Sequence, residues 1–364
     1  MKKLLFLIAL QFPLLSKANF NAADTSILKH INLAAYLELY AAVDDDDNNT
    51  HERPNFLYHN TRSGELALNL GFVKASWALE KMRGNFALMT GTYPERNLAS
   101  EPEMFQHVYE SNIGLKLSKK ANLWLDAGIF TSHIGLESAI GKDNPTLTRS
   151  LIAENSPYYE TGVKCTWISA SDQWTIAGLV LNGWQRIYKL DGNYYPATGI
   201  QINYKPNEKL QLNYSNYLGD EDPGLNYTGR LYHNFFAAYL PSDSWSFYGA
   251  FDHGTQYYSF KNVLSHENWM GWFAIAKCHF LEKFAVAARI EQFVDKDEIL
   301  IQNPYAKGFV TRGYSLNFDY ELHANALLRA EFRRFEGESN TFENRNGELR
   351  RVYDGLTVCL SVSL

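Results

Sequence analysis

The chain has 364 residues, with 40 acidic and 34 basic side chains (net charge −6), 46% hydrophobic residues and 15% aromatic residues. No basic excess is available to contact phosphates, which excludes a nucleic-acid binder, and the composition also excludes a disordered chain, a collagen and a coiled coil. The aromatic content favours an all-β protein, because Tyr, Phe and Trp pack well on half-buried pleated surfaces.

The N-terminus has the pattern of a secretory signal peptide. Two lysines precede the apolar stretch 4–15, and Ser16 and Ala18 place small residues at the −3 and −1 positions of a cleavage site. We therefore predict a cleaved signal peptide over 1–18, followed by a short periplasmic segment over 19–29. A buried N-terminal helix is the alternative.

The rest of the chain offers no apolar helix for the membrane and no metal site. No stretch after the signal peptide reaches 18 consecutive apolar residues, so a membrane role would have to use strands. Cys165, Cys278 and Cys359 are too widely spaced for a disulfide framework or a metal site, and the ten histidines lack H-x-H and H-E-x-x-H spacing. We expect neither a metal nor a cofactor.

From about residue 30 onward, apolar and polar residues alternate in segments of 9 to 13 residues. In a clear example, Leu316, Phe318 and Tyr320 alternate with Asn317 and Asp319. A period of two places such residues on opposite faces of a strand.

The connections between these segments are short and long in turn. The seven short connections lie at 80–84, 118–122, 169–172, 206–209, 241–244, 281–283 and 323–325. The eight long connections lie at 43–60, 94–106, 132–157, 184–197, 219–229, 255–268, 295–309 and 336–350.

This alternation predicts about 16 strands with both chain ends on the short-turn side. We predict a transmembrane antiparallel up-and-down β-barrel over 30–364, with short periplasmic turns and long extracellular loops. A barrel of that width can hold an aqueous channel. Two soluble sheets packed as a sandwich would also alternate and remain the alternative fold.

Several segments resemble the OmpL-like β-barrel porin family of Gram-negative outer membranes. The segments that carry the resemblance are 88–93, 126–130, 133–138, 148–151 and 154–162. The likeness extends over the layout of nearly the whole chain and, in motifs, over about residues 86–184. It implies an outer-membrane channel with no catalytic residues. One departure is the C-terminus, where Leu364 stands in place of the Phe or Trp common in such barrels.

The selectivity of such a channel depends on its width and on the charges at its narrowest point. The connection 132–157 is the longest, and we predict that it folds into the lumen and forms a constriction with charged wall groups opposite it. A loop packed on the outer rim is the alternative. The candidate loop residues are Glu137, Lys142, Asp143, Arg149 and Glu154, and the candidate wall residues are Asp252, Arg289, Glu291, Asp319, Arg329, Glu331 and Arg333.

The acidic run at 44–47 offers oxygen ligands for a divalent cation but lacks the Gly and the spaced Glu of an EF-hand loop. We expect a solvated extracellular loop there, with cations bridging it to lipopolysaccharide. The net negative charge mildly favours cations as the permeating ions.

We predict a passive channel for ions and small polar solutes, with outer-membrane lipid and lipopolysaccharide as its surroundings. By analogy, a barrel of this width is compatible with a homo-oligomer. The alternatives are a secreted glycan-binding sandwich and an outer-membrane barrel enzyme. His133, Glu137 and Ser138 lie close in sequence, but no G-x-S-x-G elbow is present, so we expect no enzyme.

Overall fold

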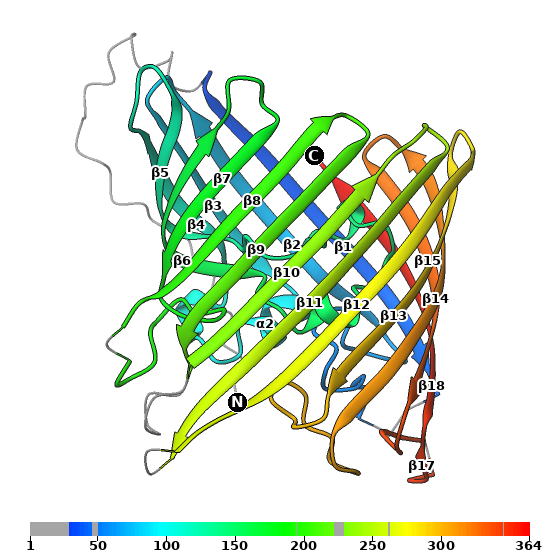
Figure 1. Cartoon of the computed structure of the whole chain (residues 1–364). Coiled ribbons are helices and arrows are strands. Elements are labelled where there is room, and N and C mark those ends of the chain that lie inside the picture. Colours follow the sequence, from blue (N-terminus) through cyan, green and yellow to red (C-terminus); the bar gives the residue numbers. More distant parts are fainter. Residues whose placement is uncertain (1–28, 46–49, 194, 222–228, 261–262, 345) are drawn as a thin grey trace, which may run out of the picture.

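A computed structural model describes residues 29–45, 50–193, 195–221, 229–260, 263–344 and 346–364. Sixteen strands form one closed antiparallel barrel, in which each strand pairs with its neighbours along the chain and β1 closes the ring by pairing with β18 (Figure 1). The barrel strands are β1 (Ile31–Asp44), β2 (Leu66–Ala78), β3 (Met82–Thr90), β4 (Val108–Lys116), β5 (Asn122–Thr131), β6 (Tyr159–Ile168), β7 (Trp174–Leu181), β8 (Ala197–Asn207), β9 (Leu210–Asp220), β10 (Gly229–Tyr239), β11 (Trp245–Phe260), β12 (Val263–Leu281), β13 (Phe284–Asp295), β14 (Phe309–His323), β15 (Ala326–Gly337) and β18 (Val352–Ser363).

The closed ring confirms the predicted barrel with its sixteen strands. Because β1 pairs with both β2 and β18, the barrel has no free edge. The sandwich alternative is therefore wrong. The predicted signal peptide, and the segment that follows it up to residue 28, lie outside the described residues. Among the described residues, no helix is long and apolar enough to cross a membrane.

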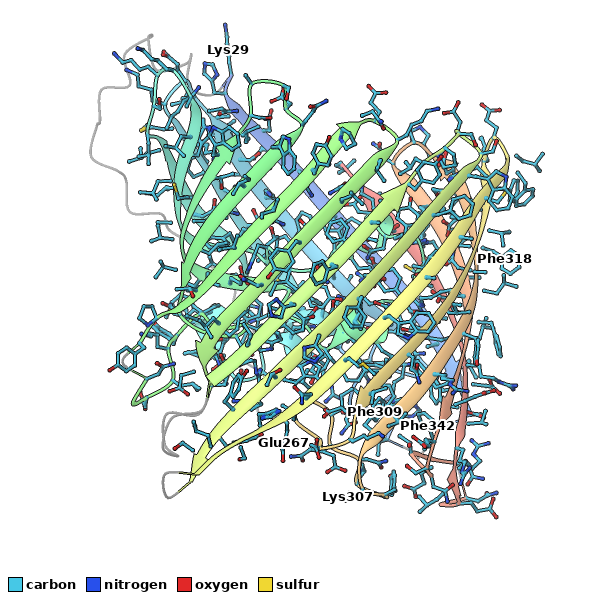
Figure 2. All side chains as sticks on the ribbon, in the orientation of Figure 1. Lys29, Glu267, Lys307, Phe309, Phe318 and Phe342 are labelled. Carbon is cyan, nitrogen blue, oxygen red and sulfur yellow. The ribbon has the colours of Figure 1, made fainter. Side chains whose placement is uncertain are left out.

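The alternation along each strand separates an apolar outer face from a polar inner face. On β14, Leu316 and Phe318 are exposed on the outside, whereas Asn317 is fully buried on the inside. Figure 2 shows Phe318 pointing away from the wall. Outward apolar residues suit lipid, and inward polar residues suit a lumen or inserted loops.

The short turns lie at one end of the barrel and the long loops at the other (Figure 1). Lys29 lies at the short-turn end, and Lys307, Phe309 and Phe342 lie at the long-loop end (Figure 2). The long connections carry the helices α2 (Thr92–Asn97) and α3 (Leu151–Glu154), the single turns η2 (Glu103–Phe105) and η3 (Gly141–Asp143), and the hairpin β16 (Phe342–Glu343) with β17 (Leu349–Arg350).

One predicted loop is wrong in its extent. The sequence places a connection at 255–268, but β11 continues to Phe260 and β12 begins at Val263. Thr255 pairs with Asn268, and Tyr257 pairs with His266. The polar residues of this hairpin resemble a loop in sequence, yet strand pairing through the main chain does not require apolar side chains.

The interior is filled mainly by the long connections. Phe56 lies within 4.9–6.2 Å, between ring centroids, of the Phe309, Phe335 and Phe342 rings, and forms a buried aromatic cluster with them near the long-loop end. This cluster holds the described loop segment 50–65 inside the barrel mouth. The core of the protein is therefore made partly of loops, which determine how much of the lumen stays free.

Candidate functional site

The connection between β5 and β6, residues 132–158, runs into the barrel, and we call it the inward loop. All its residues from Asn144 to Tyr158 are buried, and α3 packs against β12 and β13. Figure 1 shows this segment at mid-height within the ring of strands. The structure thus has the loop folded into the barrel, and the rim-packed alternative is wrong.

Arg329 of β15 binds the segment 141–146 of the inward loop. Its guanidinium donates hydrogen bonds to the main-chain oxygens of four loop residues at 2.8–3.2 Å. Its Nε also donates to Asp319 of β14 at 2.7 Å. Arg329 is 1% exposed. A guanidinium with five donors in a fixed plane suits this role, because it can satisfy several carbonyls at once. The four loop residues are Gly141, Asn144, Pro145 and Thr146.

Two residues after this segment, Thr148 is bound by Glu331 and Arg289. The Glu331 carboxylate accepts hydrogen bonds from the Thr148 main-chain nitrogen at 2.6 Å and from its hydroxyl at 2.9 Å. Arg289 donates to the Thr148 carbonyl at 2.6 Å and lies 3.0 Å from Glu331. Every polar group of Thr148 is therefore paired with a buried charge of the wall.

The start of α3 is held by Glu291. Its carboxylate accepts from the Leu151 main-chain nitrogen at 2.6 Å and pairs with Arg333 at 2.7 Å. An acidic group is favourable there, because the first main-chain nitrogens of a helix have no partner within the helix. We call Arg289, Glu291, Asp319, Arg329, Glu331 and Arg333 together the buried seam.

Hydrogen bonds within the inward loop also stabilise its conformation. Arg149 is fully buried and donates to the main-chain oxygens of Ser138, Ala139 and Leu147 at 2.5–2.9 Å. Glu137 accepts from the main-chain nitrogen and the hydroxyl of Ser150. Burial raises the pKa of Glu137, against the opposing effect of the nearby Arg289.

Glu154 joins the inward loop to the loop segment 50–65. Its carboxylate accepts from the main-chain nitrogens of Tyr58 and His59 at 2.7 and 3.2 Å, and its Oε2 lies 3.3 Å from Nδ1 of His59. Burial lowers the pKa of His59. The two loops therefore form one packed unit inside the barrel.

These contacts correct the predicted geometry of the constriction. From the sequence, we predict that the wall charges lie opposite the loop and form a constriction with it. In the structure, Arg289, Glu291, Arg329, Glu331 and Arg333 are at most 3% exposed, because the loop lies directly on them. The arginines of the wall attract main-chain oxygens of the loop, and the glutamates attract its main-chain nitrogens. The loop therefore packs directly on these charges, and no open space separates the two.

The remaining predicted residues lie elsewhere. Asp252 of β11 is buried on the inner wall and accepts from Asn234 at 2.5 Å, and Asn234 in turn accepts from the Gly135 main-chain nitrogen at 3.2 Å. Lys142 and Asp143 are exposed and pair with each other at 3.6 Å. Of the predicted loop charges, only these two face open space.

A second charged region lies on the inner face of β2 to β5, which we call the open wall. Arg83 pairs with Asp126 through two hydrogen bonds of 2.7 and 2.5 Å, and Lys74 pairs with Glu110 at 2.8 Å. The Arg83 and Lys74 side chains are 32% and 26% exposed. The sequence analysis did not propose these residues as site residues, although all four occupy inward positions of the alternation.

Glu38 of β1 was also missed. It accepts from the Gly141 main-chain nitrogen at 3.0 Å and from Asn69 at 2.7 Å. Tyr36 accepts from the Lys142 nitrogen at 3.3 Å. Both residues lie on inward positions of β1, so the alternation places them on the polar face, but no local motif distinguishes them.

The residues that resembled an enzyme site do not assemble into one. Nδ1 of His133 pairs with Glu160 at 2.9 Å, and Nε2 contacts the Asn216 carbonyl at 2.8 Å. Glu137 instead binds Ser150. Both ring nitrogens of His133 are therefore occupied by groups other than the serine.

The acidic run at 44–47 is only partly described. Asp44 is buried and pairs with Arg53 at 2.9 Å, and Asp45 lies 3.1 Å from Arg350. Asp46 and Asp47 lie outside the described residues. Within the described ranges, no group of three His, Cys, Asp or Glu side chains could hold a metal ion.

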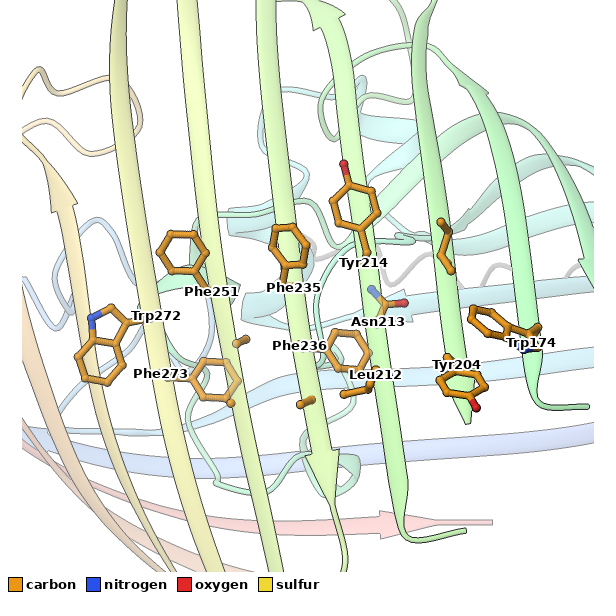
Figure 3. A pocket seen from close by; sticks show the side chains of 14 residues that line it. Trp174, Tyr204, Leu212, Asn213, Tyr214, Phe235, Phe236, Phe251, Trp272 and Phe273 are labelled. Carbon is orange, nitrogen blue, oxygen red and sulfur yellow. The ribbon is translucent and has the colours of Figure 1, made fainter. Parts of the chain in front are cut away.

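One pocket lies outside the lumen. It measures about 820 Å³ and is bounded by residues of β7 to β12, as Figure 3 shows. Leu212, Phe235, Phe251 and Trp272 on its rim are exposed members of the outer face. This depression belongs to the lipid-facing surface and contributes nothing to a path through the barrel.

A closed sixteen-stranded barrel with an apolar outer face, a polar inner face and a loop folded inside defines an outer-membrane barrel of the porin type. The chain belongs to the BBP2 family, described as "Putative beta-barrel porin-2, OmpL-like", whose profile matches residues 30–362. The resemblance seen in the sequence is therefore confirmed.

Solved porins share this fold at very low sequence identity. An anion-selective porin from Comamonas acidovorans is 8% identical with a TM-score of 0.59, and the match covers 92% of this chain and 99% of that chain. OmpF of Salmonella typhi, in complex with daunomycin, is 10% identical with a TM-score of 0.59, over 92% and 97% of the two chains. OmpT of Vibrio cholerae is 8% identical with a TM-score of 0.56, over 92% and 97%. No curated protein matches significantly.

Proposed function

We propose that the mature chain forms a water-filled channel through a Gram-negative outer membrane and lets ions and small polar solutes diffuse passively. The observation that carries the proposal is the open wall. The cationic side chains of its ion pairs, Lys74 on β2 and Arg83 on β3, are 26% and 32% exposed, whereas the charges of the seam on β13 to β15 are covered. Charged side chains on an inner barrel wall are stable where water reaches them.

In this proposal, permeating solutes pass between the open wall and the exposed tip of the inward loop at Lys142 and Asp143. The buried seam fixes the loop and takes no direct part in conduction. The constriction is therefore formed by Lys74, Arg83, Glu110 and Asp126, together with the loop tip. Non-enzymatic transport, export by a cleaved signal peptide and assembly into a homo-oligomer belong to the same proposal.

The test is the conductance of the purified mature protein in a planar lipid bilayer. Discrete current steps that grow with salt concentration are the expected result. A protein that inserts into the bilayer and conducts no current would contradict the proposal, because a packed interior would then close the barrel.

A further inference from the structure

We infer that a pocket at the long-loop end binds small carboxylate-bearing organic solutes before they pass the inward loop. This inference rests on the proposed channel function and names a solute class for it. The pocket, which we call the outer pocket, has a volume of about 300 Å³. That volume is at the lower limit of typical ligand pockets and suits a solute the size of a single sugar.

The outer pocket lies where five connections meet. Tyr58 comes from the loop after β1, Arg96 from the loop after β3, Ser156 from the inward loop, Arg186 from the loop after β7 and Leu300 from the loop after β13. Ser156 of the inward loop lines this pocket, and Pro157 and Tyr158 of the same loop line a second pocket of about 190 Å³. The inward loop therefore contributes to the walls of both pockets.

Arg186 is the group that selects an anion. It is half-buried and lines the pocket, and it forms no salt bridge in the described parts of the chain, although the Glu221 carboxylate is close enough to attract it. Arg96 lines the same pocket and pairs with Glu52, whose side chain is 49% exposed. An exposed pair of this kind is weak and exchanges readily. Two guanidinium groups thus face one small space, and guanidinium binds carboxylate through paired, charge-assisted hydrogen bonds.

The acidic residue in the lining does not oppose an anion. Glu154 is 3% exposed, and its carboxylate is occupied by the main-chain nitrogens of Tyr58 and His59 and by the His59 ring. Its charge therefore faces the protein interior.

The wall of the pocket is rigid before any solute arrives. The Gln185 side chain accepts from the Tyr158 main-chain nitrogen at 2.9 Å and donates to the Asn97 carbonyl at 3.2 Å. Gln185 also adopts a left-handed backbone with φ of 50°, a conformation that costs free energy for a residue with a Cβ atom. This anchored residue lies in sequence between Trp184 and Arg186, which also line the pocket, and the Trp184 ring is itself held by Tyr217 and Tyr232. A preorganised wall lowers the entropy cost of binding.

The test compares glucuronate with glucose, which have similar size and differ by the carboxylate. Binding to the full mature protein in detergent micelles is measured by calorimetry, and block of the ion current is measured in bilayers. We expect glucuronate to bind more tightly than glucose. Arg186→Gln should weaken glucuronate binding about tenfold, as expected for the loss of a charge-assisted pair. Arg186→Lys should restore part of it.

Arg351→Gln is the matched control, because Arg351 is exposed, lies outside the pocket and loses the same charge. Equal binding of glucose and glucuronate, or equal effects of Arg186→Gln and Arg351→Gln, would overturn the inference. The two proposals fail separately. A channel that conducts potassium chloride without preferring glucuronate refutes only the pocket, whereas glucuronate binding in micelles without any conductance refutes only the channel.

Discussion

Arg329 on β15 and Arg83 on β3 both point from the barrel wall toward the lumen, and each donates from Nε to an aspartate at 2.7 Å. Arg329 is 1% exposed and also binds four loop carbonyls, whereas the Arg83 side chain is 32% exposed and binds no loop carbonyl in the described structure. The same pair of residue types is therefore an anchor on one side of the barrel and a water-facing charge on the other. The two arginines differ because the inward loop covers the wall around Arg329 and leaves the wall around Arg83 uncovered.

The strongest test of this comparison is removal of the inward loop. Deleting residues 136–152 should raise the single-channel conductance several-fold, because the loop occupies the lumen beside the seam. The measurement is current through single channels in bilayers. Unchanged conductance would show that the loop does not restrict the path. Deletion of residues 346–348, in the connection between β16 and β17, is the control and should leave the conductance unaltered.

Replacing Arg329 should have the next largest effect. Arg329→Ala leaves several loop carbonyls without a donor and leaves Asp319 with Lys277 as its remaining cation, so the cost should approach but not exceed that of a fully broken buried pair, about 3–5 kcal/mol. We expect a lower heat-unfolding midpoint in detergent and faster proteolysis within 138–150. Arg334→Ala on the same strand, where the side chain is exposed, should behave like the unaltered protein.

On the open wall, the effect should appear in selectivity and only slightly in stability. Arg83→Gln removes a positive charge beside Asp126 and should shift the reversal potential in a salt gradient toward cations. Stability should fall by less than in Arg329→Ala, because the Arg83 side chain is 32% exposed and holds no loop carbonyl, although its partner Asp126 is buried. Arg334→Gln, outside the lumen, should not move the reversal potential. If both variants gave the same potential, the open wall would not border the path.

The smallest expected effect is that of acid on the contact between the two inner loops. The pKa of His59 is lowered by burial and by Arg149, so the unfolded loop takes up a proton first as the pH falls through the ordinary histidine range. The packing of 56–61 on Glu154 should therefore weaken at acidic pH and be fully present above that range. Hydrogen exchange of this segment at pH 7 and pH 5, corrected for intrinsic rates, measures the change. His59→Gln should abolish the pH dependence, and an equal response in that variant would rule out His59 as its source.

The sequence predicts the barrel well because two-residue alternation and the order of short and long connections follow from lipid outside and polar groups inside. It fails at the β11–β12 hairpin, where Thr255 to Asn268 pair as strands although their side chains resemble a loop. Outside the lipid-facing part of the barrel, two strands can stay paired through main-chain hydrogen bonds alone, whatever side chains they carry. Periodicity carries no signal for that extension.

For the site, sequence reasoning identifies the inward loop and the charges of the seam, but not how they meet. The partners of Arg329 are main-chain oxygens of Gly141 and Thr146, among others, and a carbonyl has no signature in the sequence. Arg83 and Lys74 were missed for a related reason. Arg83 and Lys74 occupy inward positions of the alternation, as the residues of the seam do. Only the course of the inward loop buries the seam and leaves Arg83 and Lys74 partly exposed.

The anchoring of the inward loop through its main chain has an evolutionary consequence. Arg329, Glu331, Glu291 and Glu38 all contact the main chain of the loop, so few of its side chains are needed to keep its course. The exposed tip at 142–143 is therefore free to mutate. Related chains could acquire different ion preferences at these two positions while the rest of the fold stays unaltered, and an engineer could do the same.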